Sequence, residues 1–367
     1  MNEKYIWQQK NWTAFQWDNT QLADKLRRCW KLLGELIGQT EKEDDNVLDV
    51  LLSNIIHSSA IEGEQLNGQA VRSSLAKRLG ISLAQPYPVS ERSEGVANIL
   101  FDALENRQHP LTLSRLLQWH EWLFPTQGLQ LVRVGALRGN EPMQVVSGRI
   151  DRPTVHFEAP PREILENELD RFIHWFNQSR HDVELDPLLR AGICHLWLLT
   201  LHPFDDGNGR LTRALTDMAL AQAEQQSVRL YSISSAIFHQ RNRYYQMLET
   251  AQKGERDITL WLNYFLDLLT EAVLQSLHKI RATIKRTQFW VKNAHLDLAE
   301  GQKKVLNRLL ESGENNFEHG INASQYQKVA KVSKATATRH LADLTAKELL
   351  IRSDSGGRST RYVINTP

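Results

Sequence analysis

The apolar segment 187–201 constrains the fold more than any other part of the chain. It begins with Pro187, and the large apolar residues that follow lie on every side of a helical projection. A helix that is hydrophobic all round has to be surrounded by other elements. We therefore predict a central buried helix over 187–201.

Most of the remaining chain also has helical periodicity, which predicts a mainly α-helical protein. Apolar residues recur at helical spacing over the segments 21–37, 44–61, 111–124, 164–177 and 258–284. The segment 133–160 differs, because glycines and prolines surround two β-prone pieces, Met143–Val146 and Thr154–Phe157. We predict a β-hairpin or flap there.

The C-terminal residues 301–367 are predicted to form a separate module after a connector over 285–300. They hold 11 Lys or Arg against 6 Asp or Glu, a net charge of +5 in a protein whose total is +1. Helical patterns over Ser324–Val332 and Ala335–Leu344 precede two short β-prone pieces. This order predicts a winged helix-turn-helix, which commonly binds DNA but also serves as a protein-docking or dimer module.

Composition and charge exclude several classes of protein. Lys plus Arg (44) nearly balances Asp plus Glu (43), so no overall field draws the chain to nucleic acid or membrane. No stretch approaches the ~20 apolar residues that span a bilayer, and the first residues lack the apolar core of a signal peptide. Cys29 and Cys194 lie in apolar helical patterns and are predicted to be buried thiols. We predict a cytoplasmic protein without a membrane partner.

The segment 201–213, L-H-P-F-D-D-G-N-G-R-L-T-R, combines residues that suit phosphate chemistry. It lies between two apolar helical patterns, so it is predicted to be a loop that leads into a helix N-terminus, where unpaired N–H groups favour an anion. Gly207 and Gly209 have no Cβ, so their backbone amides can approach phosphate oxygens closely. Asn208 between them is predicted to add a side-chain donor.

Charged residues of the same segment complete the pattern. Arg210 and Arg213 share a helix face and can reach one polyphosphate. Asp206 offers a hard carboxylate for Mg²⁺, and His202 can act as a general base near neutral pH. Taken singly, each feature also fits an ordinary turn or a solvated surface. No structural requirement explains all of them within twelve residues.

This segment resembles the signature of the Fic family, H-x-F-x-[D/E]-G-N-G-R-x-x-R, and matches it completely from His202 to Arg213. The resemblance implies a Fic-type helical core that transfers AMP from ATP to a Ser, Thr or Tyr hydroxyl of a target protein and of itself. Family members that act as kinases carry lysine at the position of Gly209, so the glycine favours AMP transfer.

The resemblance also implies a role for each residue of the motif. His202 takes the hydroxyl proton, and Asp206 binds Mg²⁺ that bridges the phosphates of ATP. Gly207, Asn208 and Gly209 form the anion hole. Two further roles are implied: Phe204 anchors the loop in the core, and Arg210 steadies the leaving β- and γ-phosphates.

An upstream segment, Ser58-Ser59-Ala60-Ile61-Glu62-Gly63, matches the inhibitory motif of self-restrained Fic proteins, [S/T]-x-x-x-E-[G/N]. Its matching residues are Ser58, Glu62 and Gly63. The resemblance implies that Glu62 pairs with Arg213 and withholds this arginine from the γ-phosphate. Without the downstream motif, a Glu-Gly pair would be an ordinary helix end.

Further family features are matched less specifically. Gly135-x-x-Arg138 with Val145 and Val146 resembles the flap that holds the target segment, although a plain surface hairpin is the alternative. Tyr245 and Gln252 fall where the family places groups near adenine, although tyrosines on a helix are more often core residues.

The opening aromatic cluster resembles a short module of a Fic subgroup that ends in a winged helix, and we predict that it packs against the core. Its members are Tyr5, Trp7, Trp12, Phe15 and Trp17. The predicted organisation is an N-terminal helical module (1–95), a Fic core (96–284), the connector (285–300) and the winged module (301–367). Other hypotheses stay open: a DNA-binding regulator whose core senses nucleotide, removal of AMP by the same site, and a homodimer.

Overall fold

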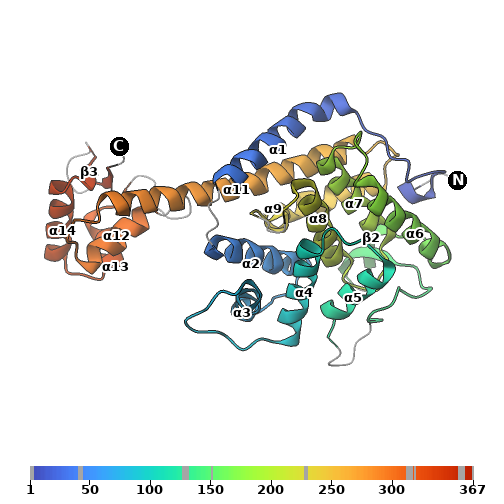
Figure 1. Cartoon of the computed structure of the whole chain (residues 1–367), viewed down its shortest axis with the longest axis horizontal. Helices are drawn as coiled ribbons and strands as arrows, with labels where there is room; N and C mark the ends of the chain where they lie inside the picture. The colour runs from blue at the N-terminus through green and yellow to red at the C-terminus, as the bar shows by residue number, and fades with distance from the viewer. Residues whose placement is uncertain are drawn as a thin grey trace. The chain divides into compact units, whose positions relative to one another are not determined.

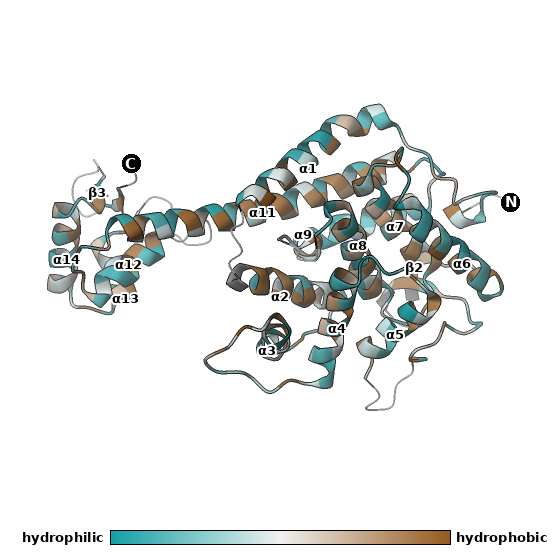
Figure 2. Cartoon of the chain, viewed as in Figure 1, coloured by the Kyte–Doolittle hydropathy of each residue, from teal (hydrophilic) through white to brown (hydrophobic). Residues whose placement is uncertain are grey.

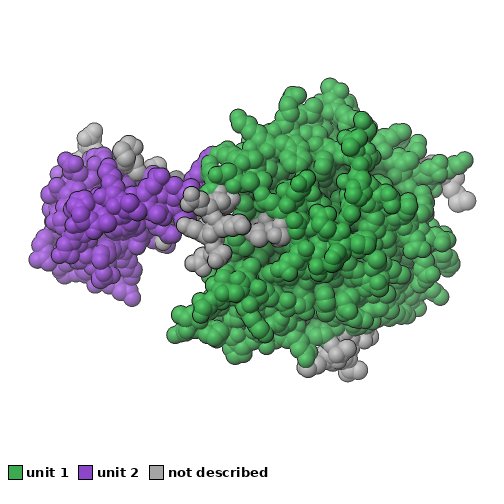
Figure 3. All heavy atoms as spheres, in the orientation of Figure 1, with its two compact units in different colours: residues 1–274 green, residues 275–367 purple. Residues whose placement is uncertain are grey.

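A computed structural model describes residues 4–39, 44–125, 132–149, 152–226, 230–310, 317, 320–353 and 360–365. The chain divides into two compact units, Met1–Leu274 and Gln275–Pro367 (Figure 3). None of the helices in these ranges is both long and apolar enough to cross a membrane. Cys29 and Cys194 are buried free thiols, as predicted.

Unit 1 is mainly helical, as the periodicity predicted (Figure 1). After a short 3₁₀ turn at Ile6–Gln8, its helices are α1 (Asn19–Gln39), α2 (Asp44–Ile61), α3 (Gly68–Leu79), α4 (Glu91–Glu105), α5 (Leu113–Leu123), α6 (Arg162–Ser179), α7 (Pro187–Leu201), α8 (Asn208–Glu224), α9 (Ile233–His239), α10 (Arg241–Gln252) and the first half of α11 (Thr259–Lys292). The boundary predicted between residues 95 and 96 falls inside α4, and both sides belong to the same compact unit.

Helix α7 is the central helix of unit 1. Every residue from Leu188 to Leu201 is buried, which confirms the prediction from its apolar composition. The helix begins with Pro187 after Asp186, whose carboxylate accepts a hydrogen bond from the Leu188 N–H (2.8 Å). Helix α8 packs along α7, so the loop between these two helices is anchored in the core at both ends.

The predicted hairpin consists of β1 (Gln144–Arg149) and β2 (Arg152–Glu158), which pair antiparallel with a register shift between Val145 and Val146. The N-terminal aromatic cluster packs on it: Tyr5 lies edge-on to Phe157 at 5.3 Å, and the indole of Trp7 donates to the carbonyl of Glu158. Trp12 also lies 5.9 Å from Trp197 of α7, so the expected packing of this cluster against the core is confirmed.

Unit 2 contains the second half of α11, then α12 (Glu300–Leu310), α13 (Ala323–Ala330), α14 (Lys334–Ala346) and an antiparallel pair, β3 (Leu350–Arg352) and β4 (Tyr362–Ile364). The tip between the strands, 354–359, lies outside the described residues. Two helices joined by a turn and followed by paired strands agree with the predicted order of elements.

The expected connector over 285–300 begins later than predicted, because α11 continues to Lys292. No Gly or Pro interrupts this stretch, and Phe289 is buried in the core of unit 2. Apolar and polar residues alternate along α11 (Figure 2), which is the pattern of a helix covered on one side.

Candidate active site

His202 ends α7 in a left-handed backbone conformation (φ 48°, ψ 59°), which is uncommon for a residue with a Cβ. Its Nδ1 lies 3.3 Å from the carbonyl oxygen of Leu199. A carbonyl can only accept, so Nδ1 carries the proton and Nε2 keeps its lone pair. Burial lowers the pKa of His202 to about 4, so the imidazole is neutral at physiological pH.

The loop after His202 is closed by Asn208, whose side chain is buried. Its Oδ1 accepts from the Phe204 N–H (2.9 Å), and its Nδ2 donates to the Phe204 carbonyl (2.8 Å). The amide that was expected to add a side-chain donor for phosphate thus uses its oxygen and one of its two N–H groups to bind the backbone of Phe204. Phe204 is completely buried beneath the loop, as expected.

The two glycines of the loop lie where side chains would collide. Gly207 has φ +85°, and a Cβ there would meet Leu123 at 2.7 Å. A Cβ on Gly209 would lie 2.1 Å from Oε1 of Glu62 and 3.1 Å from Nη1 of Arg213. The backbone at Gly209 thus directly adjoins the carboxylate and the guanidinium that the inhibitory motif concerns.

Arg213 is 1% exposed and is bound by the end of α2. Its Nη2 lies 2.8 Å from Oε1 of Glu62, which is the pairing expected from the resemblance. Ser58 accepts two further bonds, on its hydroxyl from Nε (2.9 Å) and on its carbonyl from Nη2 (2.7 Å). Nη1, the nitrogen nearest Gly209, is buried without a hydrogen-bond partner in the described residues.

Arg210 is held by a residue that the sequence analysis did not single out. Its Nη1 lies 2.6 Å from Oε2 of Glu64, and its Nη2 lies 3.4 Å from Asp206. The guanidinium also lies over the ring of Phe124, with 5.1 Å to the centroid. Glu64 comes two residues after Glu62, so one turn of the chain supplies a carboxylate to each arginine.

The carboxylate of Asp206 is 56% exposed and accepts from the Gly207 N–H at 2.5 Å. Within the described ranges, no group of three His, Cys, Asp or Glu residues could hold a metal by itself. One carboxylate fits Mg²⁺ where substrate phosphates supply further ligands. His202, Asp205, Asp206 and Gly209 retain accessible surface, so the loop is open to solvent at the residues that this chemistry needs.

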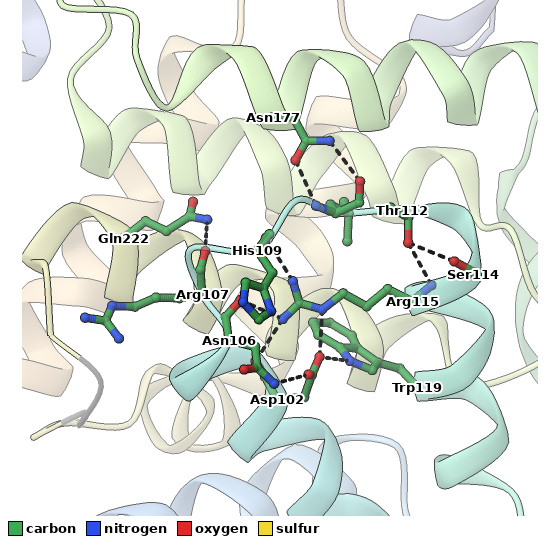
Figure 4. A network of polar contacts seen from close by, with 11 residues as sticks. Asp102, Asn106, Arg107, His109, Thr112, Ser114, Arg115, Trp119, Asn177 and Gln222 are labelled. Atoms are coloured by element: carbon green, nitrogen blue, oxygen red, sulfur yellow. Dashed lines mark hydrogen bonds and ion pairs between the residues drawn. The ribbon is translucent and has the colours of Figure 1, made fainter.

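His120 of α5 contacts the loop, and the sequence did not predict this role. Its ring stacks on Phe204 at 4.4 Å, its Nδ1 accepts from the Gly135 N–H (3.1 Å), and its Nε2 donates to the carbonyl of Asp206 (3.2 Å). The α4–α5 turn that aims this helix is itself fixed by polar contacts (Figure 4). There Asp102 accepts from Arg115 and from the indole of Trp119, both at 2.7 Å.

Arg138 and Asp205 tie the base of the hairpin to the loop. Arg138 is 2% exposed and donates from Nε to the carbonyl of His202 (2.8 Å) and from Nη2 to the carbonyl of Pro160. Asp205 accepts from the Arg133 N–H at 3.0 Å. The hairpin that contains Val145 and Val146 is therefore connected at its base to the loop that follows His202, and Val146 is 50% exposed.

A second buried network joins α7, α8 and α10. Tyr244 donates to Nε2 of His195 (2.8 Å), Nδ1 of His195 donates to Thr216 (2.9 Å), and Thr216 donates to the Thr212 carbonyl (2.7 Å). Tyr244 is thus a core residue. Its neighbour Tyr245 is half-buried, with its hydroxyl 3.3 Å from the carbonyl of Ile61 at the end of α2.

Gln252 is buried, and its amide donates to Thr200 of α7 at 3.4 Å. Its partner Thr200 is two residues before His202 in the chain, whereas Tyr245 lies against the end of α2. Both adenine-side candidates belong to the same helix, α10. Gln252 contacts α7, which ends before His202, and Tyr245 contacts the end of α2, which precedes Glu62.

Comparison with known proteins supports a Fic-type core in this chain. Residues 110–220 match the model of the Fic/DOC family, and residues 5–81 match a domain of unknown function (DUF4172). The chain is 28% identical over 227 residues to the protein adenylyltransferase Fic of Drosophila virilis and 27% identical over 227 residues to that of Drosophila melanogaster. These alignments cover 60% of this chain and 41% and 40% of the relatives, so the chain spans about two fifths of the curated relatives it matches.

Two solved structures share the fold. A Fic family protein from Desulfovibrio desulfuricans G20 has a TM-score of 0.50 and 18% identity, covering 94% of this chain and 95% of that chain. A Fic domain containing signaling protein from Bacteroides thetaiotaomicron has a TM-score of 0.52 and 19% identity, covering 69% and 95%. The chain therefore contains a mainly helical Fic fold with a small antiparallel hairpin, and has adenylyltransferase homologues.

Proposed function

We propose that this chain is a protein adenylyltransferase, which moves AMP from ATP to a Ser, Thr or Tyr hydroxyl of a target protein and of itself. One observation carries the proposal. A neutral imidazole with a free lone pair, His202, is followed within twelve residues by a helix N-terminus that bears two buried arginines. Each of these arginines keeps one buried N–H without a hydrogen-bond partner in the described structure, as a phosphate oxygen would require.

The reaction assigns one role to each group. Nε2 of His202 accepts the proton as the target oxygen bonds to the α-phosphorus, and the bond from that phosphorus to the β-phosphate oxygen breaks to release pyrophosphate. Backbone amides of 207–209 and the guanidinium of Arg210 stabilise the phosphate charge. Asp206 would hold Mg²⁺, which supplies charge neutralisation across the phosphates. The hairpin at Val145 and Val146 would hold the target segment, and Tyr245 with Gln252 would line the adenine side.

The ion pair between Glu62 and Arg213 supports an inhibited resting state. Arg213 cannot bind a γ-phosphate through Nη2 while that nitrogen is bound to Glu62 and Ser58. Gly63 has φ +81°, so it is the residue type that lets the chain turn directly after Glu62. We infer that Ser58, Glu62 and Gly63 together form the inhibitory motif that keeps the enzyme in this resting state.

Mass spectrometry of the Glu62→Gly protein incubated with ATP and Mg²⁺ tests the function. Added AMP should appear on the protein itself and rise about tenfold to a hundredfold over the unsubstituted chain, because a hydrogen bond to a charged group is worth roughly 1.5–3 kcal/mol. Equal modification of both proteins would contradict the inhibition by Glu62. Absence of AMP from both would contradict the transferase function.

A second function, duplex DNA binding, is favoured by an observation in unit 2. Residues 320–342 contain four Lys or Arg and no Asp or Glu, and all four cations are exposed. In a winged helix-turn-helix, α14 would enter the major groove, with Lys334 and Arg339 toward phosphates or bases. The affinity of the full chain for duplex DNA, measured by fluorescence anisotropy, should fall steeply as the KCl concentration rises. Dimerisation without DNA binding is the contrary outcome. The cytoplasm stays the predicted compartment.

A further inference from the structure

Glu64 is the other acidic residue of the turn that follows α2, and it binds two arginines. Its Oε2 lies 2.6 Å from Nη1 of Arg210, and its Oε1 accepts from Nε of Arg92 on α4. Its side chain is 16% exposed, so the carboxylate is largely removed from water. A carboxylate with two guanidinium partners is well compensated and is held in one place.

We propose that Glu64 is a second inhibitory residue, which withholds Arg210 from the nucleotide as Glu62 withholds Arg213. This inference rests on the proposed function of the same site. It follows from the positions of the two carboxylates, because each occupies an arginine that the loop offers to a polyphosphate. The inhibitory turn therefore acts on both arginines rather than on one.

The backbone of the turn explains how two carboxylates reach two arginines three residues apart. The carbonyl of Ser59 accepts from both the Glu62 N–H (3.1 Å) and the Glu64 N–H (3.0 Å), which fixes the chain on each side of Gly63. A Cβ on Gly63 would meet no atom within 4 Å, so the positive φ rather than crowding selects glycine there. The two carboxylates consequently belong to one rigid turn and should leave together when that turn moves.

Arg210 cannot serve a phosphate fully while Glu64 is in place. Nη1 is bound to Glu64 and Nη2 faces Asp206, and Nε is buried without a hydrogen-bond partner in the described residues. The side chain is only 7% exposed, so water can replace little of what these carboxylates provide. Substitution of Glu62 alone therefore releases Arg213 and leaves Arg210 held.

The decisive variant is Glu64→Gln, which keeps the volume of the side chain and removes its charge. Binding of the non-cleavable analogue α,β-methylene-ATP with Mg²⁺ is measured by calorimetry in the His202→Ala background, so that no reaction interferes. We expect about fivefold to tenfold tighter binding than in His202→Ala alone, and a similar gain when Glu62→Gly is already present. Glu91→Gln on exposed α4 surface is the charge-matched control and should change binding less than twofold.

The opposite result would overturn the proposal. If Glu64→Gln weakens analogue binding and lowers AMP transfer in the Glu62→Gly protein, Glu64 positions Arg210 for the reaction instead of withholding it. Unchanged binding would also overturn it. Because binding is read without turnover, failure of the transferase function would appear separately, as nucleotide binding without added AMP. Thermal melting of each variant verifies that it is folded.

Discussion

The loop at 202–213 and the helix-turn-helix at 323–346 both present charged residues near a helix N-terminus, but they hold these charges differently. Arg210 and Arg213 are buried, and each has a carboxylate partner from the turn after α2. Lys334 and Arg339 are exposed. A buried charge persists only with a partner, whereas an exposed one needs none. The loop motif therefore implies specific residues elsewhere in the chain, and the charge of the helix-turn-helix implies only a class of ligand.

Among the substitutions that test this difference, His202→Ala is expected to have the largest effect, on the rate of AMP transfer. The substitution removes the group that accepts the hydroxyl proton, and such groups contribute about 10²–10⁴-fold to rate. AMP transfer in the Glu62→Gly background, followed by mass spectrometry, should fall by that range while nucleotide binding is retained. His174→Ala, an exposed histidine of α6, is the matched control. A loss of less than tenfold would show that AMP transfer does not depend on this imidazole.

The next effect concerns Asn208, whose amide closes the loop. In Asn208→Ala the N–H and carbonyl of Phe204 lose their partners, at a cost of about 1–3 kcal/mol for each buried group. Urea unfolding should therefore show a lower free energy of unfolding together with reduced AMP transfer. Asn208→Asp keeps the acceptor for the Phe204 N–H and loses only the donor. If both variants were as stable as the parent, the loop would not need this closure.

These contacts mark where sequence reasoning succeeds and where it ends. The buried helix α7 and the loop were predictable, because an all-round apolar pattern and a specific motif are local in the sequence. The Glu62–Arg213 pair was implied only by the resemblance of the segment 58–63 to a known inhibitory motif. The orientation of the Asn208 amide was not, since a donor between glycines fits phosphate or backbone equally well. Glu64 and His120 were missed because their partners lie 146 and 86 residues away and no periodicity links them.

A smaller effect is expected at the exposed cations of unit 2. Replacing Lys334 and Arg339 together by alanine should weaken duplex DNA binding about fivefold to tenfold and reduce its salt dependence, since each phosphate contact contributes to counterion release. Lys303 and Lys304 on α12 are exposed and carry the same charge, so their double alanine variant is the matched control. Equal losses in both variants, measured by anisotropy, would mean that net charge rather than α14 determines binding.

The smallest effect is expected from a change of pH on the rate of AMP transfer. It follows from the burial of the charged and titratable groups near the loop, which the exposed groups of unit 2 lack. Burial lowers the pKa of His202 to about 4, so the neutral base persists as pH falls and is lost only near that value. A histidine with the ordinary pKa near 6.5 would lose about tenfold of its base form between pH 7.5 and 5.5. At saturating ATP and Mg²⁺, the rate of AMP transfer by Glu62→Gly should instead change less than about twofold over this range. Removal of Glu62 strengthens the expectation, because its nearby charge raises the pKa of His202 in the resting protein. A tenfold fall centred near pH 6.5 would show that the imidazole has an ordinary pKa in the active form.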